Sequence, residues 1–145
     1  MSVTKNVFVA SSLLCGAAFL TKIALIATTG GADADAPMIG VLWGLGLLTF
    51  LVSAATGAAY LLRSRATWLR VLAGIVAVPV AFTVFNSVDA LAKMVYRADG
   101  WFRDELGLVV IGVVTAAIGL AVMGSGSTRR SQQALTHEHS TPSGP

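Results

Sequence analysis

Charged residues are scarce in this chain. Only 12% of its 145 residues are Asp, Glu, Lys or Arg, whereas 55% are hydrophobic and the mean hydropathy is +0.77. Soluble domains carry roughly twice as much charge, and a soluble core of this size would not bury so much apolar surface. A lipid bilayer accepts apolar side chains when each segment satisfies its own backbone hydrogen bonds, as a helix does. The composition therefore predicts an all-α integral membrane protein.

Residues that carry chemistry are also few. Cys15 is the only cysteine, so the chain cannot form an intramolecular disulfide or a cysteine-based metal site. His137 and His139 flank Glu138, but two histidines without further ligands make a weak metal site. The sequence contains no nucleophile-and-base pattern and no phosphate-binding glycine loop. We therefore expect no enzymatic activity, no cofactor and no bound metal.

Four apolar segments of membrane-spanning length cover residues of about 7–28, 38–62, 68–91 and 105–123. Each is near the roughly 20 residues that cross a hydrocarbon core. Together they predict a four-transmembrane-helix bundle over residues 1–124. The first segment could instead be a cleaved export signal. At about 22 residues, however, it is longer than the hydrophobic region of a typical secretory signal, so we expect an uncleaved first transmembrane helix. Residues 125–145 have almost nothing to bury and are expected to form a disordered cytoplasmic tail.

The distribution of basic residues predicts the orientation. The net charge of +3 does not indicate nucleic-acid binding, because the basic residues are scattered at segment ends and form no stripe. Cytoplasmic loops carry an excess of Lys and Arg. With the amino terminus inside, six basic residues lie on the cytoplasmic side and three outside: Lys5, Arg63, Arg65, Arg70, Arg129 and Arg130 against Lys93, Arg97 and Arg103. The count predicts a multi-pass protein of the cell membrane with an N-in/C-in orientation.

The first candidate site lies near the outer membrane boundary. Ionisable residues within hydrocarbon are costly unless paired or hydrated, which draws attention to Lys22 and Asp89. Asn86 and Lys93 stand three residues before and four after Asp89, spacings that share one helix face. This candidate polar cluster of Lys22, Asn86, Asp89 and Lys93 could form a pocket for a small charged ligand or for protons, and a Lys22–Asp89 pair is sterically feasible. We favour the simpler interpretation that Lys22 extends to the headgroups and that Asp89 pairs with Lys93.

Residues 93–105 combine aromatic and charged side chains. Within this stretch Tyr96, Trp101, Phe102 and Arg103 form a candidate partner-docking loop, since aromatic residues and Arg are favoured at protein interfaces. Aromatic residues at this depth also anchor helices among the headgroups, and Trp68 at the opposite boundary fits that account. Anchoring is the interpretation we favour.

Small residues recur at the spacing that lets transmembrane helices approach closely. The candidate helix-packing positions are Gly40, Gly44, Ser53, Gly57, Gly112 and Ala116, with Ser12 and Gly16 at the same spacing in the first segment. We expect them to hold the chain's own bundle together, and a share of them could build a homo-oligomer. Pro79, midway along the third segment, predicts a kink, because proline removes a backbone donor.

These patterns favour a small polytopic membrane protein without enzymatic activity, acting as an accessory or interaction subunit. Its partners would be membrane lipid and either copies of itself or a larger membrane complex, with no nucleic acid. The alternative is a small oligomeric transporter or channel with an outer-leaflet polar site at Lys22, Asn86 and Asp89. A membrane-embedded enzyme is the weakest hypothesis, because only Asp89, Asp104 and Glu105 are candidate catalytic groups.

Overall fold

The computed structural model describes residues 3–31, 36–96 and 100–138, with side chains as far as Ser125. The described part is all-helical and contains four helices: α1 (Val3–Thr28), α2 (Pro37–Leu61), α3 (Thr67–Val95) and α4 (Trp101–Glu138). Each has a stretch long and apolar enough to cross a membrane, which in α4 is Trp101–Ser125. The prediction of an all-helical chain with four helices of membrane-crossing length is therefore confirmed.

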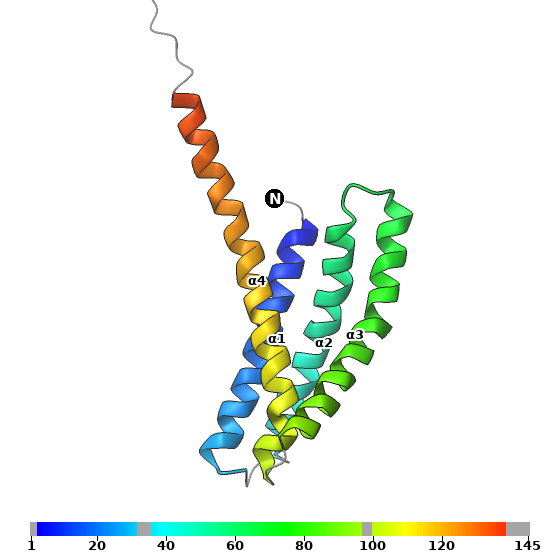
Figure 1. The fold of residues 1–145 in the computed structure, drawn as a ribbon, viewed down its shortest axis with the longest axis vertical. Helices are drawn as coiled ribbons and strands as arrows, with labels where there is room; N and C mark the ends of the chain where they lie inside the picture. Colours follow the sequence, from blue (N-terminus) through cyan, green and yellow to red (C-terminus); the bar gives the residue numbers. More distant parts are fainter. Residues whose placement is uncertain (1–2, 32–35, 97–99, 139–145) are drawn as a thin grey trace, which may run out of the picture.

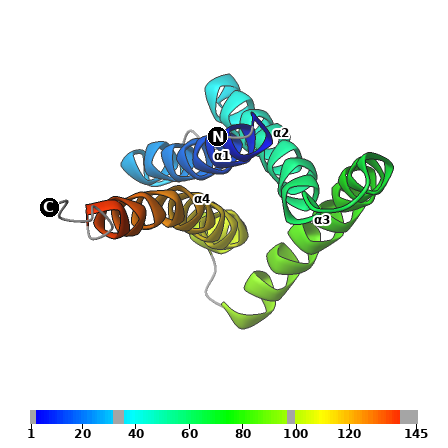
Figure 2. The same ribbon diagram turned by 90° about the horizontal axis from the view of Figure 1, so that it is seen from above.

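The four helices run alternately up and down and form a ring in chain order (Figure 1). α1 packs along α2 and α4, while α3 packs against α2 and α4. The start of α1, the turn between α2 and α3 and the middle of α4 lie at one end, which we call the N-terminal end (Figure 1). The opposite end holds the end of α1, the start of α2, the end of α3 and the start of α4. Seen from above, α3 and α4 are separated at the N-terminal end and meet at the opposite end (Figure 2).

Local sequence explains where several helices begin and bend. α2 begins at Pro37, which lacks the N–H that a first helical turn leaves unpaired. α1 ends before Gly30 and Gly31, both with positive φ angles (61° and 93°), which glycine adopts without a Cβ clash. α3 changes direction near its middle, where Pro79 lies within the helix (Figure 1). The bend carries α3 away from α4 toward the N-terminal end.

The predicted helix boundaries stop short of the observed ones. α3 continues to Val95 rather than residue 91, and α4 begins at Trp101 rather than residue 105. The prediction ended each helix where charge appeared, but Lys, Arg and Glu are good helix formers at a membrane boundary. α4 runs as a helix to Glu138 and projects beyond the other helices (Figure 1). The disordered tail expected over residues 125–145 stays a prediction. Residues 139–145 lie outside the described part.

A small aromatic and aliphatic core holds the ring together. Its buried members are Cys15, Phe19, Phe85, Leu108 and Ile111. The Phe85 ring contacts those of Phe19 and Phe50, with ring centroids 6.1 Å and 5.7 Å apart. Most other apolar side chains of the spans face outward, as expected where lipid is the solvent and helix association depends on close packing rather than on the hydrophobic effect.

Close packing uses some of the predicted small residues. A Cβ on Gly16 would lie 2.7 Å from the Cβ of Ala116 and 2.8 Å from the carbonyl oxygen of Gly112, so α1 and α4 touch backbone to backbone there. Gly57 is covered by the Phe8 ring, 2.8 Å from where its Cβ would stand. These positions join α1 to both of its neighbours.

Two predicted packing residues take no part in the intrachain contacts. Gly40 and Gly44 are exposed, and a Cβ on either would meet nothing within 4 Å in the described structure. Gly46, which the small-residue spacing did not single out, is buried instead under the Phe19 ring. The G-x-x-x-G pattern of α2 therefore faces outward, and the packing face is the one that contains Gly46.

Candidate functional site

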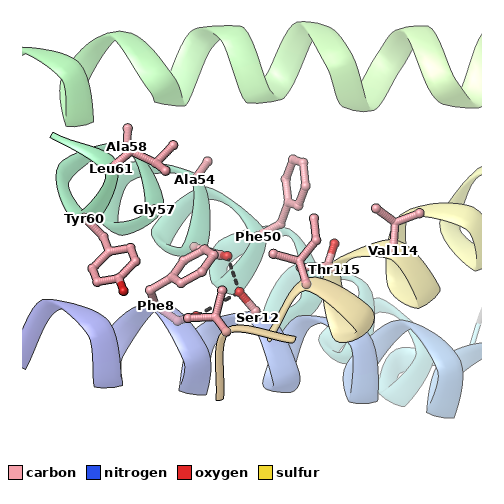
Figure 3. A pocket seen from close by; sticks show the side chains of 13 residues that line it. Phe8, Ser12, Phe50, Ala54, Gly57, Ala58, Tyr60, Leu61, Val114 and Thr115 are labelled. Carbon is pink, nitrogen blue, oxygen red and sulfur yellow. Dashed lines mark hydrogen bonds between the residues drawn. The ribbon is translucent and has the colours of Figure 1, made fainter. Parts of the chain in front are cut away.

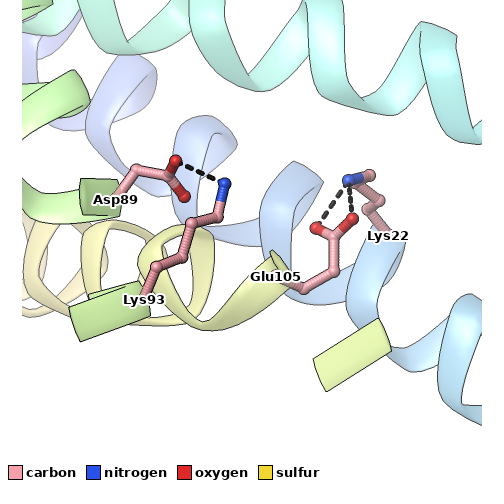
Figure 4. A network of polar contacts seen from close by, with 4 residues as sticks. All are labelled: Lys22, Asp89, Lys93 and Glu105. Atoms are coloured by element: carbon pink, nitrogen blue, oxygen red, sulfur yellow. Dashed lines mark hydrogen bonds and ion pairs between the residues drawn. The ribbon is translucent and has the colours of Figure 1, made fainter. Parts of the chain in front are cut away.

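The buried charge of α1 is paired with the first turns of α4. The Lys22 ammonium donates hydrogen bonds to both carboxylate oxygens of Glu105, each at 2.6 Å (Figure 4). The Lys22 and Glu105 side chains are 8% and 14% exposed, respectively. Because both charges are desolvated, each depends on the other. This ion pair connects the first helix to the last and closes the ring.

Asp89 pairs within its own helix. Lys93 donates a hydrogen bond to Asp89 Oδ2 at 2.8 Å, and the two side chains are 31% and 38% exposed for Asp89 and Lys93, respectively. A Cβ on Gly107 of α4 would lie 2.7 Å from the Asp89 Cα, so α3 and α4 are in close contact here. The pair therefore lies beside the Lys22–Glu105 pair at the same end of the bundle (Figure 4).

The structure thus divides the candidate polar cluster. Asp89 lies with Lys93, as the simpler interpretation expects. Lys22, however, binds Glu105 instead of extending to the headgroups. The sequence interpretation missed Glu105 as a partner because it began the fourth helix at that residue and assigned it no helix face. A signal was available, since Asp104 and Glu105 follow Gly100 and acidic residues are favoured in a first helical turn.

Asn86 lies on the outward face of α3. Its side chain is exposed, and its Nδ2 donates to the carbonyl oxygen of Phe82 at 2.8 Å. Thr83 and Ser87 beside it are also exposed and donate to the carbonyl oxygens four residues earlier, at 2.9 Å each. A shallow groove of about 380 Å³ runs along the same helix past Pro79. The outward face of α3 therefore carries three polar side chains among exposed apolar ones.

A deeper cavity opens between α1, α2 and α4 toward the N-terminal end (Figure 3). Its volume is about 490 Å³, and apolar side chains from all three helices line it, among them Phe8, Phe50 and Val114. At its base Ser12 and Ser53 share a hydrogen bond of 2.6 Å. Hydropathy gave no signal for this cavity, because it is as apolar as the lipid-facing surfaces.

The aromatic residues of the predicted docking loop pack mainly on one another. Phe102 contacts the rings of Tyr96 and Trp101 edge to face, with centroids 5.7 Å and 5.8 Å away. Trp101 also covers Gly31, whose Cβ would lie 2.7 Å from the indole. These contacts join the α1–α2 connection to the start of α4, and Arg103 follows in the same first turn of the helix.

The described residues offer little for metal or nucleophilic chemistry. Among them, no group of three or more His, Cys, Asp or Glu side chains is placed to hold a metal ion. Cys15 is fully buried in the core. The side chains of His137 and His139 lie outside the described part. What the described residues provide is the two charge pairs, a helix face with three polar side chains, and an apolar cavity.

Comparisons with known proteins give no family for this chain. No protein-family model matches it, and neither the curated proteins nor the solved structures yield a match.

Proposed function

We propose that the chain is a non-enzymatic membrane subunit that assembles with another membrane-spanning chain along the outward face of α3. The observation that carries the proposal is the exposed Asn86 carboxamide. Asn86 lies nine residues before the end of α3, or about 14 Å along the helix axis. A hydrocarbon core of about 30 Å centred on this helix would therefore contain it.

A carboxamide facing lipid is costly unless its hydrogen bonds are satisfied. One N–H of Asn86 is bonded to Phe82, but within the described part no hydrogen bond is found for Oδ1. Thr83 and Ser87 do not require a partner helix, because their hydroxyls donate hydrogen bonds to carbonyl oxygens of α3 itself. Polar residues of this kind commonly bond across transmembrane helix interfaces. Asn86 therefore supports a helix partner, and the hydroxyls beside it widen a face that such a partner can contact.

A second copy of the chain is the partner that best fits this face. A carboxamide both donates and accepts, so two Asn86 side chains related by a two-fold axis satisfy one another. Closed two-fold dimers are also the commonest assemblies of identical chains. In this proposal the dimer lies in the cell membrane in the N-in/C-in orientation that the basic residues favour.

Single-cysteine cross-linking tests the proposal. In a Cys15→Ala background, Thr83→Cys on α3 should form a disulfide-linked dimer under mild oxidation in nanodiscs. Val113→Cys is the matched control, because it is exposed on α4 and lies as far from the start of α4 as Thr83 lies from the end of α3. Asn86→Leu should weaken association about threefold to thirtyfold, which corresponds to roughly 0.6–2 kcal/mol.

Three outcomes would contradict the proposal. Equal cross-linking at Thr83→Cys and Val113→Cys would mean random collision. A strictly monomeric particle in both mild detergent and nanodiscs would remove the interaction role. Cross-linking of Thr83→Cys to a different membrane protein would keep that role and overturn the choice of a second copy.

No specific observation favours the transporter alternative. That hypothesis needs Lys22, Asn86 and Asp89 around one polar cavity. Lys22 is held by Glu105, Asp89 is held by Lys93, and Asn86 faces outward. The deep cavity between α1, α2 and α4 is apolar and contains none of the three.

A further inference from the structure

The apolar cavity between α1, α2 and α4 has the length of one membrane leaflet. Along α2 it extends from Phe50, near the middle of the span, to Leu61 at the helix end. Eleven residues of helix measure about 16 Å. Half of a hydrocarbon core measures about 15 Å. The cavity therefore runs from the membrane midplane to its boundary at the N-terminal end.

Its width suits a hydrocarbon chain rather than a helix. Even with its open side included, the cavity holds about 1040 Å³ of free space, which over that length is a mean cross-section of about 60 Å². A helix with side chains is at least about 10 Å across, or roughly 80 Å² in section. A transmembrane helix of a partner would not fit without moving α2 or α4, whereas a single flexible chain would.

The lining has almost no polar surface to offer. Phe8, Phe50 and Val114 face the cavity, and the small side chain of Ala54 leaves room along its wall (Figure 3). The Ser12 and Ser53 hydroxyls at its base are buried and bonded to each other. An occupant deep in the cavity therefore meets apolar side chains and the hydroxyls of Ser12, Ser53 and Thr115, which are already hydrogen-bonded within the protein.

The mouth of the cavity is basic. Tyr60 lines the cavity near the end of α2, and the Arg63 guanidinium lies 4.9 Å from the centre of its ring. This contact holds the cation beside the opening. Arg65 is exposed in the same turn. Among the side chains that the structure describes, the acidic ones all belong to the opposite end of the bundle: Asp89, Asp104 and Glu105.

We propose that this cavity binds one anionic phospholipid, with an acyl chain between α1, α2 and α4 and the phosphate beside Arg63. The apolar lining and leaflet length select an acyl chain, and the basic mouth selects an anionic headgroup. Arg binds phosphate through parallel N–H donors, and each basic residue near the surface favours an anionic lipid about fivefold. The site is separate from the outward face of α3, so neither proposal depends on the other.

Native mass spectrometry of the chain in mild detergent tests the site. With phosphatidylglycerol added, one lipid should remain bound per chain at activation energies that remove phosphatidylcholine. Arg63→Gln should reduce the preference for phosphatidylglycerol about fivefold, whereas Arg65→Gln, which removes the same charge away from Tyr60, should change it less. Ala54→Phe should fill the cavity and lower lipid retention at least tenfold, and Val113→Phe on the outer surface of α4 is its control.

Photolabelling of the unaltered chain locates the lipid without any substitution. Phosphatidylglycerol with a diazirine midway along its acyl chain should label residues 50–61 and 114–122. Labelling confined to the outward face of α3 would overturn the site. Equal retention of the two phospholipids by the unaltered chain would overturn the headgroup assignment. Retention by Ala54→Phe equal to that of Val113→Phe would overturn the acyl-chain assignment.

Discussion

Replacing Glu105 by Gln should destabilise the bundle by about 3 kcal/mol. The carboxylate accepts two hydrogen bonds from Lys22, whose side chain is only 8% exposed. Removing the negative charge leaves this ammonium buried without a counterion, which generally costs about 3–5 kcal/mol. We expect a cost at the lower end of this range. Lys22 lies six residues from the end of α1, about 9 Å along the helix, so its flexible side chain can move toward the headgroups.

Removing both charges together should cost much less. In the double variant Lys22→Met/Glu105→Leu no buried charge remains, and apolar side chains of similar volume fill the same space. Such replacements are often neutral or stabilising, so its stability should fall within about 1 kcal/mol of the unaltered chain. The double variant should therefore be more stable than Glu105→Gln alone. If Glu105→Gln destabilised the bundle only by disturbing its packing, the second substitution would not restore stability.

Reversible unfolding by sodium dodecyl sulfate from mild-detergent micelles, followed by circular dichroism, measures these free energies. Asp89→Asn is the control, because the Asp89–Lys93 pair is about one third exposed and links neighbouring turns of one helix. Pairs of that kind contribute about 0.5 kcal/mol or less. The Lys22–Glu105 pair does not stabilise the bundle in this way if Glu105→Gln costs no more than Asp89→Asn, or if the double variant is less stable than Glu105→Gln.

Two further predictions concern packing. Gly46→Ala should destabilise the bundle by about 1–3 kcal/mol, because its Cβ would collide with the Phe19 ring. Gly40→Ala in the same helix should be neutral or stabilising by up to about 1 kcal/mol, because its Cβ would meet open space; the same detergent titration measures both, and equal effects would contradict the assignment of the packing face. Cys15 is fully buried and should react with a maleimide only upon unfolding, with the same midpoint as the loss of helical signal. Rapid labelling of the folded chain would show that the α1 core contact is wrong.

Part of the candidate polar cluster could be predicted because it is local. Asp89 and Lys93 are four residues apart on one helix, so their pairing requires no knowledge of the other helices. The partner of Lys22 is 83 positions away in the sequence. Finding it requires the start of α4 and the rotation of two helices about their axes. Hydropathy determines neither, because a charged residue at the membrane boundary has the same hydropathy whether it lies in a loop or in the first turn of a helix.

The small residues show the same limit. Spacing alone selected Gly40 and Gly44 as packing positions, yet they face outward, while Gly46 lies against Phe19. In a soluble helix an apolar stripe marks the buried face. A membrane helix is apolar around its whole circumference, so the sequence does not mark which side is turned inward. Only the positions of the neighbouring helices separate these glycines.

The sequence by itself determined that four apolar segments form helices of membrane-crossing length, where they are interrupted, and that Pro79 would bend the third. These properties follow from the transfer of side chains into hydrocarbon and from local backbone geometry. The tertiary structure decided that Lys22 binds Glu105, that Asn86 faces outward, and that an apolar cavity lies between α1, α2 and α4. Each of these depends on the rotation and separation of the helices. Because lipid surrounds the bundle with an equally apolar solvent on every side, the hydropathy of the sequence does not show which face of a helix is turned inward.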